Sequence, residues 1–210
     1  SNANITINGP GKVHLFLDGD LYIRNGSRIN GAGNDNLLEL YHSGDKIEFQ
    51  GGIGGQEKYK FAGTIYTKAR EIYIQNGANF KGKLYSLDGD LKIQGGATSS
   101  ALLYTRTGNI IINNGAKVSG QIISGGEKIE IFGGSIFDGD LKENGIIAPY
   151  AAIYIDQGAT IKGTIFANPE KVQIANINHR DSFYRIPNVF NENKYIEEIT
   201  VYSLTDNPNI

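Results

Sequence analysis

Apolar and polar residues alternate over short segments through most of this chain. In "IIINNGAKVSGQII" (110–123), Ile110 and Ile112 are two positions apart, and Val118 and Ile122 follow in the same phase after a turn. Side chains with this spacing lie on one face of a β-strand. The pattern therefore predicts short strands that bury aliphatic residues on one side and are separated by sharp turns.

The same strand-and-turn phrase recurs along the chain, and each copy is marked by a residue pair that ends in glycine. These glycines are Gly26, Gly52, Gly77, Gly96, Gly115, Gly134 and Gly158. The successive intervals in the sequence numbering are 26, 25, 19, 19, 19 and 24. Three equal steps in succession indicate a repeated structural unit, and the longer steps predict inserts near 53–59 and at 142–148.

Each unit has the ingredients of one coil of a parallel β-helix. Asn114-Gly115 can adopt the positive φ that a sharp corner requires, and Gly120 supplies a second corner. We therefore expect three short strands in about 19 residues, stacked on neighbouring coils so that the inward Ile and Val residues are buried. A β-sandwich would also contain many short strands, but it would not require the same corner at a constant interval.

The repeat divides the chain into three parts. Residues 1–3 (Ser-Asn-Ala) are interpreted as the remnant of a cleaved expression tag, and residues 4–177 as a single all-β domain, a single-stranded parallel β-helix. Its first coil is expected in "NITINGPGKVHLFLDGDLYI", and an eighth strand without a glycine pair in "KVQIANI" (171–177). Residues 178–210 are expected to form a capping tail packed on the solenoid.

The tail differs from the coils because it has few glycines and several aromatic residues. Its segment "YIEEITVYSL" (195–204) alternates like a strand, while a short helix over 191–198 is the alternative.

Composition agrees with many short strands joined by tight turns and excludes several kinds of chemistry. Glycine accounts for 28 of the 210 residues, and the net charge is −2 without a basic block, so nucleic acid is not an expected partner. The chain has no cysteine, which excludes disulfides, thiolate metal sites and a cysteine nucleophile. No cofactor is predicted.

The chain also has no methionine, even at position 1, so we expect the natural protein to begin upstream with a signal peptide or a membrane anchor. No apolar run approaches the ~20 residues of a membrane helix. We therefore expect membrane association only through such an anchor, and an extracytoplasmic, cell-surface location; a cytoplasmic location is the alternative.

The phrases "GNIIINNGAKVSGQIISGGEKIEIFGGSIFDGDL" and "YIDQGATIKGTIFA" resemble two groups of bacterial proteins. They are similar to the β-helical C-terminal domains of membrane-anchored surface proteins associated with type IV pili, and more distantly to bactofilins, which polymerise. The resemblance covers roughly residues 70–175. It implies a right-handed, non-enzymatic β-helix, and the inserts and the tail favour the surface proteins over bactofilins.

The motif Asp-Gly-Asp occurs at 18–20, 88–90 and 138–140. Paired carboxylates at a turn can bind a hard cation such as Ca²⁺. Asp and Gly are also preferred turn residues, and the Gly-Gly-x-Gly-x-Asp spacing of calcium-binding solenoids is absent. We therefore interpret the motifs as corners and assign no metal site, leaving open a single weakly bound ion.

A polysaccharide-degrading enzyme would need clustered carboxylates beside a groove. The outward positions of the regular coils are instead expected to be mixed and unclustered: Asn113, Lys117, Ser119, Gln121, Lys128 and Glu130. His179, Arg180 and Asp181 occur together, but in the predicted tail, and His14 and His42 are isolated in the sequence. No catalytic residue is assigned.

Tyrosines occupy one place in three repeats, at Tyr22, Tyr73 and Tyr154, each between two inward aliphatic residues. We expect them to face outward, either as a stacking stripe for sugars or a partner protein, or as tyrosines on a solvated strand.

Taken together, the sequence predicts a non-catalytic structural or adhesive module of a bacterial cell-surface or pilus-associated protein. Expected partners are envelope or pilus proteins, a second copy of the chain, or a glycan. A cytoplasmic polymerising scaffold and a carbohydrate-binding or carbohydrate-degrading β-helix are the alternatives.

Overall fold

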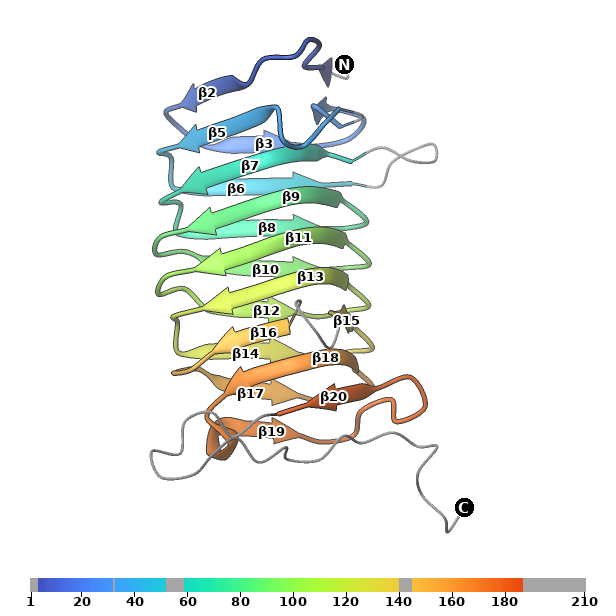
Figure 1. The fold of residues 1–210 in the computed structure, drawn as a ribbon. Coiled ribbons are helices and arrows are strands. Elements are labelled where there is room, and N and C mark those ends of the chain that lie inside the picture. The colour runs from blue at the N-terminus through green and yellow to red at the C-terminus, as the bar shows by residue number, and fades with distance from the viewer. Residues whose placement is uncertain (1–3, 32, 52–58, 140–144, 187–210) are drawn as a thin grey trace.

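The computed structural model is a parallel β-helix whose coils stack along one axis from the N-terminal to the C-terminal end (Figure 1). It describes residues 4–31, 33–51, 59–139 and 145–186. Twelve strands form the larger sheet: β1 (Asn4–Ile5), β2 (Val13–Leu17), β4 (Arg28–Ile29), β5 (Leu38–His42), β7 (Phe61–Thr67), β9 (Asn79–Ser86), β11 (Thr98–Thr105), β13 (Lys117–Ser124), β15 (Ile136–Asp138), β16 (Gly145–Ala148), β18 (Thr160–Ala167) and β20 (Phe183–Arg185).

A smaller sheet of eight strands completes each coil. It contains β3 (Leu21–Ile23), β6 (Lys46–Gln50), β8 (Glu71–Gln75), β10 (Asp90–Gln94), β12 (Ile110–Ile112), β14 (Lys128–Ile131), β17 (Ala152–Ile155) and β19 (Val172–Ile174). A 3-10 helix, Pro169–Lys171, precedes β19. None of the helical residues that the structure describes forms a segment long and apolar enough to cross a membrane.

The register of the strands reproduces the period of the sequence. Leu91 in β10 is paired in parallel with Ile72 in β8 and with Ile110 in β12, one full period of the repeat away in each direction. Equivalent residues of successive coils therefore lie directly above one another, and each strand in the interior of a sheet hydrogen-bonds to the coils on both sides. The predicted parallel β-helix, with its constant coil length in the regular part of the chain, is confirmed.

The corner after the short strand has the predicted conformation. Asn114 and Gly115 have φ values of 54° and 74°, and the equivalent Asn76 and Gly77 have 53° and 76°. Two successive left-handed residues reverse the chain sharply, and asparagine and glycine tolerate this conformation best.

The second corner differs from the prediction of three separate strands. Gly120 has a φ of 114°, but it lies inside the continuous eight-residue strand β13, which turns at this glycine without ending. Gly82 in β9 and Gly163 in β18 repeat the conformation with φ values of 121° and 122°. Each regular coil therefore has two hydrogen-bonded strands, and the second of them bends at a glycine in β9, β13 and β18.

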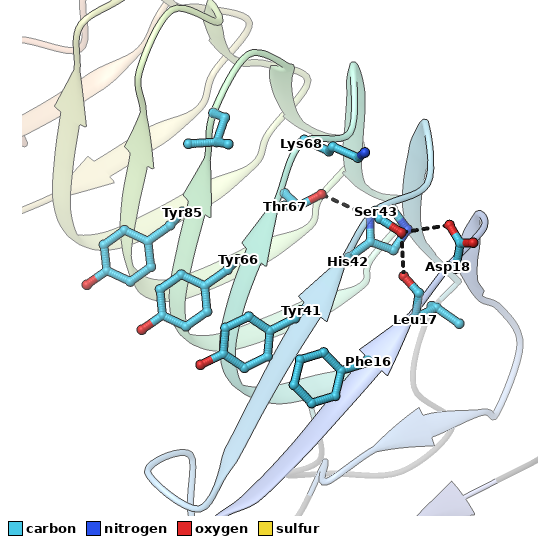
Figure 2. Close-up of a pocket in the computed structure, with 11 residues that line it drawn as sticks. Phe16, Leu17, Asp18, Tyr41, His42, Ser43, Tyr66, Thr67, Lys68 and Tyr85 are labelled. Atoms are coloured by element: carbon cyan, nitrogen blue, oxygen red, sulfur yellow. Dashed lines mark hydrogen bonds between the residues drawn. The ribbon is translucent and has the colours of Figure 1, made fainter.

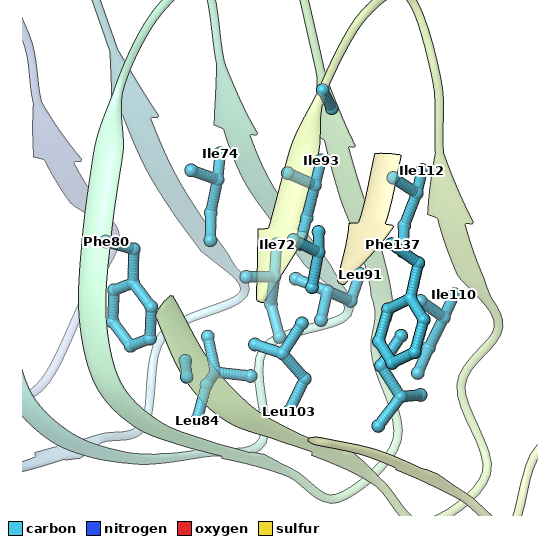
Figure 3. Close-up of a cluster of buried hydrophobic side chains, with 14 of the residues drawn as sticks. Ile72, Ile74, Phe80, Leu84, Leu91, Ile93, Leu103, Ile110, Ile112 and Phe137 are labelled. Carbon is cyan, nitrogen blue, oxygen red and sulfur yellow. The ribbon is translucent and has the colours of Figure 1, made fainter. Parts of the chain in front are cut away.

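Inward side chains form one continuous core (Figure 3). Ile72, Leu91 and Ile110 stack in one column and are fully buried. Near the N-terminal end the rings of Phe49, Phe61 and Phe80 pack together with centroids 5.7–5.9 Å apart. Full burial of one Ile, Leu or Phe side chain stabilises the fold by about 1.5–3 kcal/mol relative to leaving that side chain exposed.

The predicted insert at 142–148 is wrong in its second half. Ile146 of β16 is opposite Ile122 of the preceding coil and Ile165 of the following one, and its side chain is fully buried. Residues 145–148 therefore belong to the ladder, because their alternation matches the inward and outward positions of the neighbouring strands.

Both ends of the predicted domain continue the ladder. β1 and β2 pair with β4 and β5, which confirms the predicted first coil, and β19 lies in the predicted eighth strand. Within the predicted tail, β20 adds a parallel strand to β18. The strand predicted at 195–204 and the alternative helix at 191–198 lie outside the described residues.

Candidate functional site

The three tyrosines singled out by the sequence face outward on the smaller sheet, as predicted. The register nevertheless separates them, because Glu48 lies between Tyr22 and Tyr73. The column then runs through Lys92, Ile111 and Glu130 before it reaches Tyr154. Lys46 and Lys92 place their ammonium groups 5.0 and 5.3 Å from the centre of the Tyr73 ring. These tyrosines therefore form no continuous stripe.

A continuous aromatic column is present on the outside of the larger sheet. It consists of Phe16, Tyr41, Tyr66, Tyr85 and Tyr104, which we call the aromatic ladder. Centroids of successive rings are 5.0, 5.1, 5.1 and 6.0 Å apart, and the first three pairs are stacked nearly in parallel. Figure 2 shows the first four rings in a row, with the tyrosine hydroxyls on one side.

The column continues with apolar residues along the rest of the sheet. Ile123 lies opposite Tyr104, and Ile147 and Phe166 follow in the next coils. The strand alternation and the glycine repeat do not predict this ladder, although the sequence contains a signal for it. Each ring directly precedes the last residue of its strand, and the intervals between the rings in the sequence numbering are 25, 25, 19 and 19.

A groove of about 440 Å³ lies between the ladder and the corner that follows it. The rings of Phe16, Tyr41, Tyr66 and Tyr85 line one side of the groove. The corner contributes Leu17, Asp18, Ser43, Lys68 and Leu87, and His42 and Thr67 also line the groove (Figure 2). This volume is in the range of small-molecule sites. The wall is mainly apolar, with polar groups along the corner.

His42 belongs to the inner wall of this groove. Its side chain is buried, and its Nδ1 lies 2.9 Å from Thr67 Oγ1, which also accepts a hydrogen bond from the Ala69 amide. Burial lowers the pKa of His42 below its ordinary value of 6.5, against the weaker opposing effects of the Gly19 backbone and Asp20. The neutral ring is therefore the form that fits the fold.

The Asp-Gly-Asp motifs at 18–20 and 88–90 connect neighbouring coils. Asp18 accepts a 2.7 Å hydrogen bond from Ser43 Oγ, and Asp20 accepts bonds from the amides of Asp45 and Lys46. The Tyr22 hydroxyl also donates to Asp20 and lowers the pKa of that carboxyl.

The second motif repeats this arrangement. Asp88 forms a 2.7 Å ion pair with Arg106, which lowers the pKa of Asp88, and Asp90 accepts from the Asn109 amide. These contacts support the interpretation of both motifs as corners. Asp138 of the third motif ends β15, while Asp140 lies outside the described residues. Across the described ranges, no three His, Asp or Glu side chains are arranged to hold a metal ion.

Charged side chains flank the ladder on the side away from the groove. Glu39 accepts hydrogen bonds from Lys12 Nζ at 2.9 Å and from the Tyr41 hydroxyl at 3.0 Å, and both lower the pKa of Glu39. His14, isolated in the sequence, lies 3.2 Å from Glu39. Lys83, in the same row, and Lys68, in the groove, are exposed and form no ion pair with any residue that the structure describes.

The cluster at Asn178–Asp181 precedes β20, which lies at the opposite end of the β-helix from β2 (Figure 1). Asn178 Nδ2 donates a 2.8 Å hydrogen bond to Asp181, which closes a turn before β20. His179, Arg180 and Asp181 are exposed on this turn. The occurrence of these three polar residues together is thus explained by the turn that they form.

Residues 1–86 match the model of a family described as a domain of unknown function (DUF7305). The matched segment contains the coils that carry Phe16, Tyr41, Tyr66 and Tyr85. No curated protein and no solved structure matches the chain.

Proposed function

We propose that this chain is a non-catalytic adhesive module of a bacterial cell-surface or pilus-associated protein, and that the groove beside the aromatic ladder is its contact surface. The observation that carries the proposal is the ladder itself. Tyr66, in its interior, remains 38% exposed although rings stack on both of its sides. Exposed aromatic residues of this kind, with polar groups beside them, are typical of binding surfaces.

The architecture supports a binding role more than a catalytic one. The aspartates of the two corner motifs already accept hydrogen bonds or ion pairs from the next coil, and these contacts hold the coils in register. Polysaccharide hydrolysis would instead require two carboxylates facing a substrate.

Surface labelling of the bacterium that makes this protein tests the proposal. Antibodies raised against the folded β-helix should label intact cells, and brief protease treatment of those cells should abolish the signal. Labelling that requires permeabilisation would contradict a cell-surface role and favour a cytoplasmic scaffold.

A self-associating scaffold is the second candidate, and the N-terminal coil favours it. β2 pairs with β5 on one side and lies at the edge of the sheet, where Ile5 and Phe16 are 48% and 79% exposed. Such an edge can accept another strand. Sedimentation velocity over a range of concentrations should show assembly if this candidate holds, and a concentration-independent monomer would exclude it.

A further inference from the structure

We propose that the groove binds an extended, β-1,4-linked chain of acidic hexopyranose sugars, aligned with the axis of the β-helix. This inference rests on the proposed function, because it names the ligand class of the same surface.

The repeat of the ladder carries the first part of the argument. Ring centroids from Phe16 to Tyr85 are 5.0–5.1 Å apart, close to the ~4.8 Å spacing of neighbouring strands. An extended β-1,4-linked hexopyranose chain advances by a similar length with each sugar. A chain lying along the axis would therefore place one sugar beside each ring, with the side groups of successive sugars pointing to alternate sides.

The chemistry of the walls fits a sugar. A pyranose ring has an apolar C–H face and a polar rim of hydroxyl groups. The groove offers both kinds of partner, with partly exposed aromatic rings and Leu87 on one hand, and Asp18, Ser43 and Lys68 on the other. Phe16, at the end of the ladder, is stacked against Tyr41 and is 79% exposed, so it can stack on a terminal sugar.

An extended peptide fits the same surface less well. Peptides that bind sheets usually add a strand to a free edge. β5, β7 and β9 are paired with neighbouring strands on both sides. At these strands the groove offers side chains only, which suits a ligand that is recognised through apolar contacts with the exposed parts of the rings and through its hydroxyl groups.

Two lysines beside the ladder favour an acidic sugar chain, while the Asp18 carboxylate in the same groove is engaged by the Ser43 hydroxyl. Glu39 is engaged by Lys12, and Asp88 by Arg106. Lys68 follows Tyr66 by two residues, and Lys83 precedes Tyr85 by two. The aromatic ladder therefore has one exposed ammonium group on each of its two sides at these strands. Neither forms an ion pair within the described part of the chain. Carboxylates on successive sugars would complement them.

Calorimetric titration with two oligosaccharides of equal length tests the proposal. The probes are β-1,4-linked glucuronate hexasaccharide and cellohexaose, which share a backbone and differ in the carboxylate. We expect the acidic probe to bind at least about threefold more tightly at low salt, and this preference to shrink as salt screens the lysines.

Substitutions then locate the site. Tyr66→Ala should weaken binding of the acidic probe about tenfold, as expected for the loss of a central aromatic contact. Tyr154→Ala is the matched control, because Tyr154 is also 38% exposed but lies on the smaller sheet. Tyr66→Phe keeps the ring and should retain most of the affinity, which provides a test if the alanine variant fails to fold.

Lys68→Gln should reduce the preference for the acidic probe while leaving binding of cellohexaose unchanged. Lys117→Gln, at an exposed lysine on β13, should change neither. Failure of both probes to bind, equal affinity for both, or self-association that Tyr66→Ala abolishes would each overturn the proposal. Cell-surface labelling would be unaffected by those results, so the proposed function would stand or fall separately.

Discussion

The inward residue just before the corner of each coil is mostly polar, in contrast with the aliphatic residues that fill the core. His42, Thr67, Ser86, Thr105 and Ser124 occupy this column and are buried. Ser86 Oγ accepts from the Gly89 amide, and Ser124 Oγ accepts from the Gly126 amide. These side chains accept hydrogen bonds from backbone amides at the point where the chain leaves the sheet. Without them, these amides would be buried without a partner.

His42 makes this column sensitive to pH. Its pKa is lower in the folded state than in the unfolded state, where it is close to 6.5, so the unfolded chain binds the proton more readily. The free energy of unfolding should therefore be highest above pH 6.5 and should fall as the pH decreases from 6.5 toward the folded-state pKa. One such group contributes at most about 1.4 kcal/mol per pH unit.

Urea unfolding at pH 7.5 and 5.5 measures this effect above the range in which the carboxylates titrate. His42→Asn should reduce the difference in unfolding free energy between the two pH values, whereas His179→Asn, on an exposed turn, serves as the control. An unchanged pH dependence in His42→Asn would show that burial of this ring does not control the acid response.

At the scale of the single element, the bent strand distinguishes these coils from a simple succession of short strands. Gly82 has a φ of 121°, which is accessible essentially only to glycine, and a Cβ there would collide with the carbonyl oxygen of Gly63 in the preceding coil. Gly115, at the other corner, has a φ of 74° and open space where a Cβ would be. Gly115 is therefore favoured by its backbone conformation alone, whereas Gly82 is favoured by its conformation and by the close approach of the preceding coil.

Alanine substitutions at these two glycines should differ in cost. Gly115→Ala should lower the free energy of unfolding by about 1–2 kcal/mol, the cost of a left-handed alanine. Gly82→Ala should lower it by roughly 3 kcal/mol or more, because a collision is added to the backbone strain. Chemical denaturation of both variants gives the comparison, and equal losses would show that the neighbouring coil moves aside without penalty.

At the scale of the whole molecule, stability and surface both follow from stacking of similar coils. Thr98 is paired with Asn79 on one side and with Lys117 on the other, the equivalent residues of the two adjacent coils. A coil contacts mainly its two neighbours, so its removal should leave the remaining interfaces intact if the register is kept.

Deletion of residues 98–116, one full period of the repeat, should give a folded β-helix of lower stability that keeps the groove. Deletion of residues 98–115, one residue fewer, should not fold cooperatively, because a slip of one position turns every inward side chain outward. Circular dichroism and thermal unfolding distinguish the two, and similar behaviour of both variants would contradict register as the organising constraint.

The sequence by itself determined the coil and its core. Alternating aliphatic residues and a corner pair that ends in glycine, recurring at a constant interval, act through local geometry: the alternation of a strand and the left-handed conformation of a corner. The sequence also indicated the corner role of Asp18 and Asp88. It did not distinguish a bend from a break at Gly120, because the neighbouring strand keeps hydrogen-bonding across that glycine.

Only the tertiary structure decided which outward residues become neighbours. Tyr22 and Tyr73 share a column, but the coil between them places Glu48 there, whereas the same three coils bring Phe16, Tyr41 and Tyr66 into contact. Which outward residues lie next to each other depends on where each strand re-enters the sheet after an insert. That position is determined by the stacking of the buried side chains. The core pattern is thus local in the sequence, while the groove is a product of register.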